Sequence, residues 1–66
     1  MKVKDFLSVC AFEPQEIKDF SGNIYLLNGR KYARYEEMEV AKVTNKCGYI
    51  TIYLNTYGYD GEYQPV

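Results

Sequence analysis

A strictly alternating segment, Tyr49–Asn55, is the feature that most limits what this chain can fold into. Every second residue of it is apolar, which places one row of side chains on one side of an extended strand. The four residues Asn45–Gly48 before it are typical of a turn, and another strand-like segment, Glu39–Thr44, precedes them. The two segments predict a β-hairpin with one buried face.

A second hairpin is predicted earlier in the chain, where Ser21-Gly22 separates the strand-like segments Glu16–Phe20 and Asn23–Leu27. Both faces of this hairpin carry apolar groups, and a sheet of that kind usually has both faces covered. Simple alternation assigns three residues to each face. One face is expected to carry Ile17, Ile24 and Leu26, and the other Phe20, Tyr25 and Leu27.

A third turn is predicted at Asn28-Gly29, a pair that fits a type I′ hairpin turn. The segment Arg30–Tyr35 is then expected to return as a strand. The alternative is a short helical turn over Tyr32–Met38, and the sequence alone does not separate the two.

A short N-terminal helix is predicted from four residues spaced i, i+3, i+4 and i+7, namely Val3, Phe6, Leu7 and Cys10. Pro14 cannot continue a helix and restricts the residue before it, so the helix is expected to end near Ala11 or Phe12.

A helix followed by hairpins predicts an α+β fold, in which the short N-terminal helix packs on one face of a four- or five-stranded antiparallel sheet. The 66 residues suffice for one domain over residues 1–55, and residues 56–66, rich in Tyr and Gly, are expected to form a loosely ordered tail. The expected core combines the apolar rows of helix and strands: Phe6, Leu7, Ile17, Ile24, Leu26, Val43, Ile50, Ile52 and Leu54.

One helix cannot cover both faces of such a sheet, so the opposite face is expected to expose Tyr25, Leu27, Val40, Tyr49 and Tyr53. An exposed aromatic patch of this kind marks a binding or dimer surface. The alternative is that tyrosines simply suit strands and pair across them. The predicted partner-binding residues are Tyr25, Tyr49 and Tyr53, with Glu36, Glu37 and Glu39 as an acidic rim.

The composition argues against enzymatic chemistry. The chain has no His, which excludes Ser-His, Cys-His and His-metal arrangements. Cys10 and Cys47 lack zinc-ligand spacing and are expected to be reduced thiols, and the glycines form no phosphate-binding loop. We therefore expect a non-enzymatic protein without cofactor or metal. The sequence also shows no membrane span or signal peptide.

The alternative partner is nucleic acid. Arg30, Lys31 and Arg34 are interleaved with Tyr32, and basic groups beside aromatic rings suit single strands. Three glutamates follow closely, however, and 8 basic against 9 acidic residues give a net charge of −1, so a protein partner is favoured. A homodimer with the tyrosine face buried against itself is the third hypothesis.

Several motifs together resemble short proteins of phages and mobile elements in low-GC Gram-positive bacteria. They are the opening Met1–Leu7, Glu16–Asp19 with the turn Ser21–Asn23, Val40-x-x-Val43, and Tyr49–Leu54. The resemblance covers residues 1–55 and implies a small accessory protein, such as an anti-CRISPR-type inhibitor. It further implies that the protein acts in the cytoplasm of a bacterial host by binding a host protein, such as a defence nuclease. No site residue carries over from it.

Overall fold

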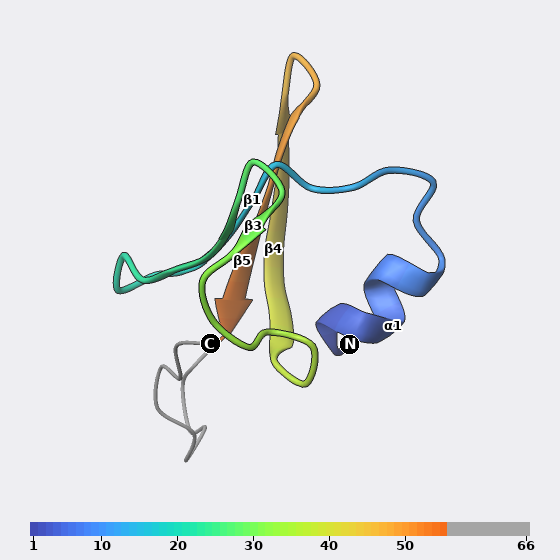
Figure 1. The fold of residues 1–66 in the computed structure, drawn as a ribbon. Coiled ribbons are helices and arrows are strands. Elements are labelled where there is room, and N and C mark those ends of the chain that lie inside the picture. Colours follow the sequence, from blue (N-terminus) through green and yellow to red (C-terminus); the bar gives the residue numbers. More distant parts are fainter. Residues whose placement is uncertain (56–66) are drawn as a thin grey trace.

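The computed structural model describes residues 1–55 as a five-stranded sheet with one short helix beside it (Figure 1). In chain order the elements are α1 (Val3–Ser8), β1 (Glu16–Asp19), β2 (Ile24–Leu27), β3 (Arg30–Lys31), β4 (Glu39–Lys46) and β5 (Tyr49–Asn55). The predicted α+β class is confirmed. The prediction of a loosely ordered tail over 56–66 lies outside the described residues.

The strand order is β3-β2-β1-β5-β4, and the pairing of β1 with β5 in the middle is parallel. The other neighbours are antiparallel, so the sheet is mixed and the prediction of a purely antiparallel sheet is wrong. Turn residues determine only how strands adjacent in sequence pair. The central pairing joins two separate hairpins, and the stretch from 32 to 38 carries the chain across to the far edge of the sheet, where β4 begins (Figure 1).

The three predicted turns are confirmed by positive φ angles at their glycines. The last hairpin is tighter than expected, because β4 continues to Lys46 and leaves a two-residue turn, Cys47-Gly48. Cys47 has a φ of 53° and Gly48 a φ of 86°, the left-handed pair that a type I′ turn requires. The Asn45 side-chain oxygen accepts a hydrogen bond from the Gly48 amide at 3.0 Å, which fixes the turn.

A β-bulge in β2 overturns the predicted distribution of side chains in the second hairpin. Ile17 pairs with Leu26, but Lys18 pairs with Ile24, so Tyr25 is an extra residue in its strand. A bulge shifts the alternation by one position. Tyr25 consequently points into the core, where it is 2% exposed, and Ile24 lies half-buried on the opposite face.

The core lies on one face of the sheet, which we call the covered face. Its buried members come from α1, three strands and the stretch between β3 and β4: Val3, Ile17, Tyr25, Ala33, Met38, Ile52 and Leu54. Phe6, Leu7 and Leu26 pack against them as predicted, and Ile50 is buried too. Val43 is wrong as a core residue, because it is 38% exposed near the tip of the hairpin.

Two local predictions needed correction. Helix α1 ends at Ser8 instead of Ala11 or Phe12, and Phe12 turns back to pack edge-on against Phe6 at 6.5 Å between ring centroids. Beyond the two-residue strand β3, the stretch from 32 to 38 is neither strand nor helix. Its core contacts are made by Ala33, Tyr35 and Met38, so it serves as a cover over the sheet.

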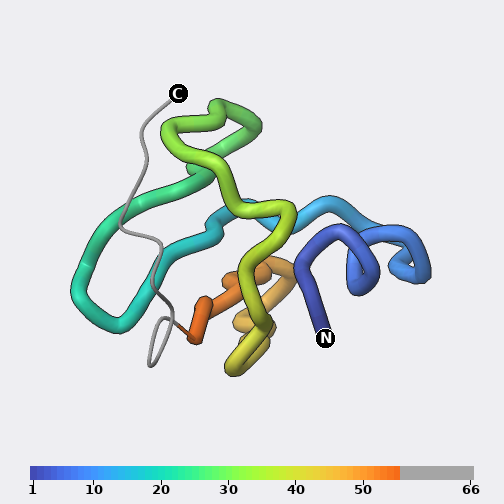
Figure 2. The backbone as a smooth tube through the Cα atoms, turned by 90° about the horizontal axis from the view of Figure 1, so that it is seen from below, coloured from blue at the N-terminus to red at the C-terminus, as the bar shows by residue number. Residues whose placement is uncertain are grey.

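The start of α1 is held by this covering stretch. The amides of Val3 and Lys4 donate hydrogen bonds to the carbonyl oxygens of Met38 and Glu36, at 2.9 and 3.0 Å. The first amides of a helix have no partner within it, so these bonds act as its N-terminal cap. Figure 2 shows the first turn of the helix next to the chain that leads into β4.

Candidate binding surface

The face of the sheet opposite to the core is the open face. Strand register places on it Glu16, Lys18, Ile24, Leu27, Arg30, Glu39, Lys42, Thr44, Lys46, Tyr49, Thr51, Tyr53 and Asn55. Among these described residues Thr51 alone is buried. The covered face, in contrast, holds the whole core cluster. The open face is therefore where side chains of the sheet meet their surroundings.

Tyr53 lies on the open face in strand β5, between β1 and β4. Its ring stacks on that of Phe20 with 5.2 Å between centroids and 15° between planes. The ammonium groups of Lys18 and Lys42 lie 5.3 and 5.7 Å from the centroid of the Tyr53 ring, both within the range of a cation–π contact. Lys18 belongs to β1 and Lys42 to β4, the two strands that flank β5. Both lysines lie beside the Tyr53 ring because each pairs directly with Tyr53 in the sheet register.

The same combination recurs four residues earlier on β5. Tyr49 is 41% exposed and pairs directly with Lys46 of β4. Residues four apart on a strand share a face and are separated by about 13 Å. The open face thus carries a lysine–aromatic surface of six residues: Lys18, Phe20, Lys42, Lys46, Tyr49 and Tyr53.

The charge of this surface is positive although the net charge of the chain is −1. Glu16 lies on the same face, 3.8 Å from the Lys18 ammonium, but its side chain is only 15% exposed. Glu39 is held at 2.7 Å by the N-terminal ammonium of Met1. Within residues 1–55, Lys42 and Lys46 form no ion pair, so their charge faces outward.

Tyr25 does not belong to this surface, and its predicted grouping with Tyr49 and Tyr53 on one exposed face is wrong. Its hydroxyl donates a hydrogen bond to the Asp19 carboxylate at 3.1 Å inside the core. Asp19 is itself 4% exposed and also accepts from the amides of Ser21 and Asn23 and from the Asn23 side chain. Burial acts to raise the pKa of the Asp19 carboxyl, but these hydrogen bonds outweigh it and lower that pKa.

The predicted acidic rim lies away from the open face, apart from Glu39, and its carboxylates are engaged within the chain. Glu37 accepts from the ammonium groups of Lys2 and Lys4, each at 2.8 Å, and Glu36 pairs with Lys31. The two lysines lower the pKa of Glu37 from 4.5 to about 2. Burial acts to raise the pKa of Glu36, but the Lys31 hydrogen bond and further bonds lower it overall. Glu37 therefore clamps the N-terminal segment to the chain before β4, whereas Glu36 holds the end of β3.

The basic segment predicted for nucleic acid is not gathered into one site. Arg30 lies over the Tyr32 ring at 5.2 Å on the β3 edge, and Lys31 lies over the Tyr35 ring at 5.0 Å while it pairs with Glu36. Arg34 is exposed between Ala33 and Tyr35, whose side chains turn to the core. Arg30 shares the open face but lies on its β3 edge, two strands away from Lys18 on β1, and Lys31 and Arg34 lie off that face.

Four of the six residues of the lysine–aromatic surface were missed from the sequence: Lys18, Phe20, Lys42 and Lys46. Lys42 and Lys46 are four residues apart before the Cys47-Gly48 turn, and Tyr49 and Tyr53 are four residues apart after it. A register drawn across this turn would have paired Lys46 with Tyr49 and Lys42 with Tyr53. No local pattern in the sequence indicated Lys18 and Phe20, because the parallel pairing of β1 with β5 brings these two residues next to Tyr53.

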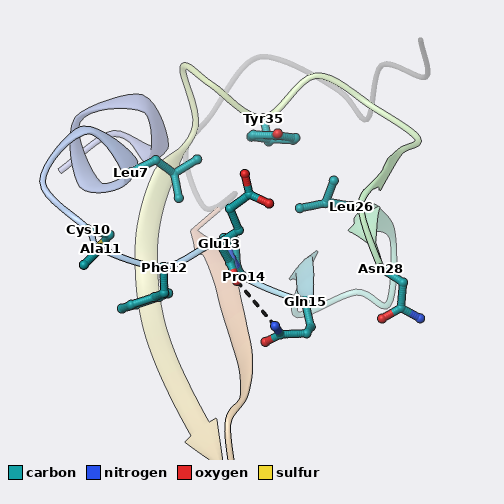
Figure 3. A pocket seen from close by; sticks show the side chains of 11 residues that line it. Leu7, Cys10, Ala11, Phe12, Glu13, Pro14, Gln15, Leu26, Asn28 and Tyr35 are labelled. Atoms are coloured by element: carbon teal, nitrogen blue, oxygen red, sulfur yellow. Dashed lines mark hydrogen bonds between the residues drawn. The ribbon is translucent and has the colours of Figure 1, made fainter.

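A separate groove of about 920 Å³ opens on the other side of the sheet (Figure 3). Leu7, Leu26 and Tyr35 provide its apolar walls, and Figure 3 shows the Glu13 side chain reaching between them. Cys10 also lines it, and both cysteines are free thiols, Cys47 being exposed. The lining holds one carboxylate and one thiol without a basic partner, which suits packing of an apolar group better than acid–base chemistry.

Residues 1–55 contain no cluster of three potential metal ligands, and α1 is too short and too polar to be a transmembrane span. A comparison of this chain with protein-family models, with curated proteins and with solved structures found no match.

Proposed function

We propose that this chain is a non-enzymatic binding protein that engages an anionic macromolecule through the lysine–aromatic surface. The observation that carries the proposal is the environment of Tyr53, which lies between two lysines and against the exposed Phe20 ring on the open face. Aromatic rings give contact area at a small loss of side-chain entropy, and lysines select a partner of opposite charge.

The lysine–aromatic surface suits an anionic partner better than it suits a second copy of this chain. In a twofold dimer the same patch meets itself, so Lys18, Lys42 and Lys46 of one copy would face those of the other. Like charges brought together in this way disfavour association. The homodimer hypothesis therefore receives less support from this geometry than an anionic partner does.

The accessory role implied by the resemblance, inhibition or modulation of a host protein, stays a proposal that uses the same surface. Its acidic rim would no longer contribute, because Glu36 and Glu37 are paired with lysines of this chain. A host protein that fits the open face would have to present carboxylates to Lys42 and Lys46.

Retention on immobilised heparin, a general polyanion, tests the proposal. We expect Lys42→Gln to elute at a clearly lower salt concentration than the unchanged chain. Arg34→Gln is the matched control, because it removes the same charge from an exposed position away from the surface. Equal elution shifts for the two variants, or no retention of the unchanged chain at low salt, would contradict the proposed function.

A further inference from the structure

We infer that the anionic partner is a single-stranded nucleic acid, with bases stacking on Phe20, which Tyr53 supports from behind, and on Tyr49, and with phosphates held by Lys18, Lys42 and Lys46. This inference rests on the proposed function and specifies the chemical class of the partner. It is drawn from how rings and ammonium groups alternate on the open face, since charge alone would not distinguish nucleic acid from an acidic protein.

The aromatic part of the surface offers ring faces instead of ring edges. Phe20 and Tyr53 are nearly parallel, with 15° between their planes, and Phe20 remains 58% exposed. A parallel pair with one ring this exposed can be extended by a further flat ring. Bases provide such rings in every nucleotide, which is why stacking platforms serve single strands irrespective of sequence.

The cations are placed where the backbone of a stacked strand would run. Lys18 and Lys42 lie on either side of Tyr53, and Lys46 lies beside Tyr49. About 13 Å separates the two tyrosines along β5. At the 3.4 Å axial spacing of phosphates in a stacked strand, this distance corresponds to roughly four nucleotides. The surface therefore repeats one unit, an aromatic ring with a neighbouring lysine, at intervals that a short oligonucleotide can follow.

Duplexes and acidic proteins fit less well. A duplex hides the faces of its bases inside its own stack, so it can offer phosphates to the lysines but no ring to Phe20. An acidic protein has carboxylates for the lysines, but its charged side chains have no flat ring to place against Phe20 and Tyr53. Single-stranded DNA or RNA provides one flat ring and one phosphate in every nucleotide, which matches the repeat of rings and lysines on the open face.

Fluorescence anisotropy with a labelled 12-nucleotide oligo(dT) tests the inference at low salt, using the full chain. Phe20→Leu and Tyr53→Leu remove a ring but keep an apolar side chain, and we expect each to weaken binding by about 5- to 160-fold. The matched control is Phe12→Leu, because Phe12 is also an exposed phenylalanine, 42% against 58%, but belongs to the groove on the other side. Its affinity should stay within twofold of the unchanged chain.

The salt dependence of oligo(dT) affinity is a second measurement, and it would not change if the lysines had only a structural role. For a single strand, each lysine–phosphate contact contributes about 0.7 to the slope of log affinity against log salt. Lys42→Gln should therefore reduce that slope by about 0.7, while Arg34→Gln leaves it unchanged. Circular dichroism of every variant verifies that the sheet is intact.

Poly-L-glutamate and a duplex of the same length are the competitors that separate the outcomes. Poly-L-glutamate displacing the chain from heparin, with no anisotropy change for oligo(dT), would leave the proposed function standing and overturn the nucleic-acid inference. Equal affinity for duplex and single strand, or equal losses for Phe20→Leu and Phe12→Leu, would overturn it as well. Failure to bind any polyanion would remove both.

Discussion

The two faces of this sheet use the same residue types for opposite purposes. On the covered side, Tyr25 is buried and hydrogen-bonded, and the Glu37 carboxylate is held between two lysines of its own chain. On the open side, Tyr53 is flanked by two lysines and Lys42 has no carboxylate partner within residues 1–55. The two sides therefore differ in how completely their charged and aromatic side chains are partnered within the chain, more than in residue type.

The largest expected effect separates the two tyrosines. Tyr25→Ala should remove about 3–5 kcal/mol from the free energy of unfolding, because it empties a fully buried site. A core of this size supplies only about 3–5 kcal/mol in total, so this variant should be unfolded by circular dichroism at 25 °C. Tyr53→Ala should cost about 1 kcal/mol or less in urea denaturation, since it loses one stack and two cation–π contacts at a partly exposed site.

The milder substitution Tyr25→Phe keeps the ring and removes only the hydroxyl, which donates a hydrogen bond to the Asp19 carboxylate. It should fold and lose about 1–2 kcal/mol, the usual cost of a hydrogen bond to a charged group. Equal destabilisation by Tyr25→Phe and Tyr53→Phe would show that the two faces do not differ in the way described.

The second expected effect concerns Asp19, which holds the tip of the β1–β2 hairpin to the core. Asp19→Ala should lower the free energy of unfolding by about 2–3 kcal/mol, because donors from Ser21, Asn23 and Tyr25 lose their acceptor in a buried site. Asp5→Ala, at an exposed position of α1, is the control and should stay within about 0.5 kcal/mol of the unchanged chain. A similar cost for both in urea denaturation would contradict the assigned role of Asp19.

The sequence predicted those parts of the fold that depend on neighbouring residues. The alternation of Tyr49–Asn55, the left-handed turn residues and the stripe of α1 are local signals, and each led to the right element. The bulge at Tyr25 was missed because alternation counts every residue as in register. That single shift exchanged the predicted faces of Tyr25 and Ile24.

The candidate site was predicted only in part, for Tyr49 and Tyr53, because its other members meet through long-range pairing. Lys18 reaches Tyr53 across 35 positions by the parallel contact of β1 with β5, and no turn or period in the sequence specifies that contact. Phe20 follows from the same pairing. The acidic rim failed for a related reason: its cations, Lys2, Lys4 and Lys31, lie outside its own segment.

The third prediction tests whether the ion pairs of Glu37 with Lys2 and Lys4 stabilise the folded chain. The pKa of Glu37 is about 2 in the folded chain against 4.5 as its ordinary value, so the folded state favours the ionised carboxylate. Its contribution is complete above about pH 5 and is lost as the pH falls through the range from about 4.5 to 2. The lowered pKa values of Glu36 and Asp19 act in the same direction.

Thermal melting between pH 7 and pH 2.5 measures this contribution. We expect Glu37→Gln to have a lower melting temperature than the unchanged chain at pH 7 and a smaller further loss on acidification. Glu13→Gln is the control, because Glu13 is exposed in the groove and forms no ion pair within residues 1–55. An identical pH profile for Glu37→Gln and the unchanged chain would mean that the two lysines do not clamp this carboxylate in solution.

The smallest expected effect separates stability from binding. Cys47 takes a left-handed φ of 53° that Asn adopts more readily, and Asn-Gly is the preferred pair for this type of turn. Cys47→Asn should therefore raise the free energy of unfolding by about 0.5 kcal/mol. Cys47 is exposed at the tip of the β4–β5 hairpin, outside the lysine–aromatic surface, so oligo(dT) affinity should not change. A gain in stability accompanied by a matching gain in affinity would mean that binding depends on the order of the hairpin as a whole. Unchanged affinity for oligo(dT) would mean that binding depends on the rings and lysines of the open face.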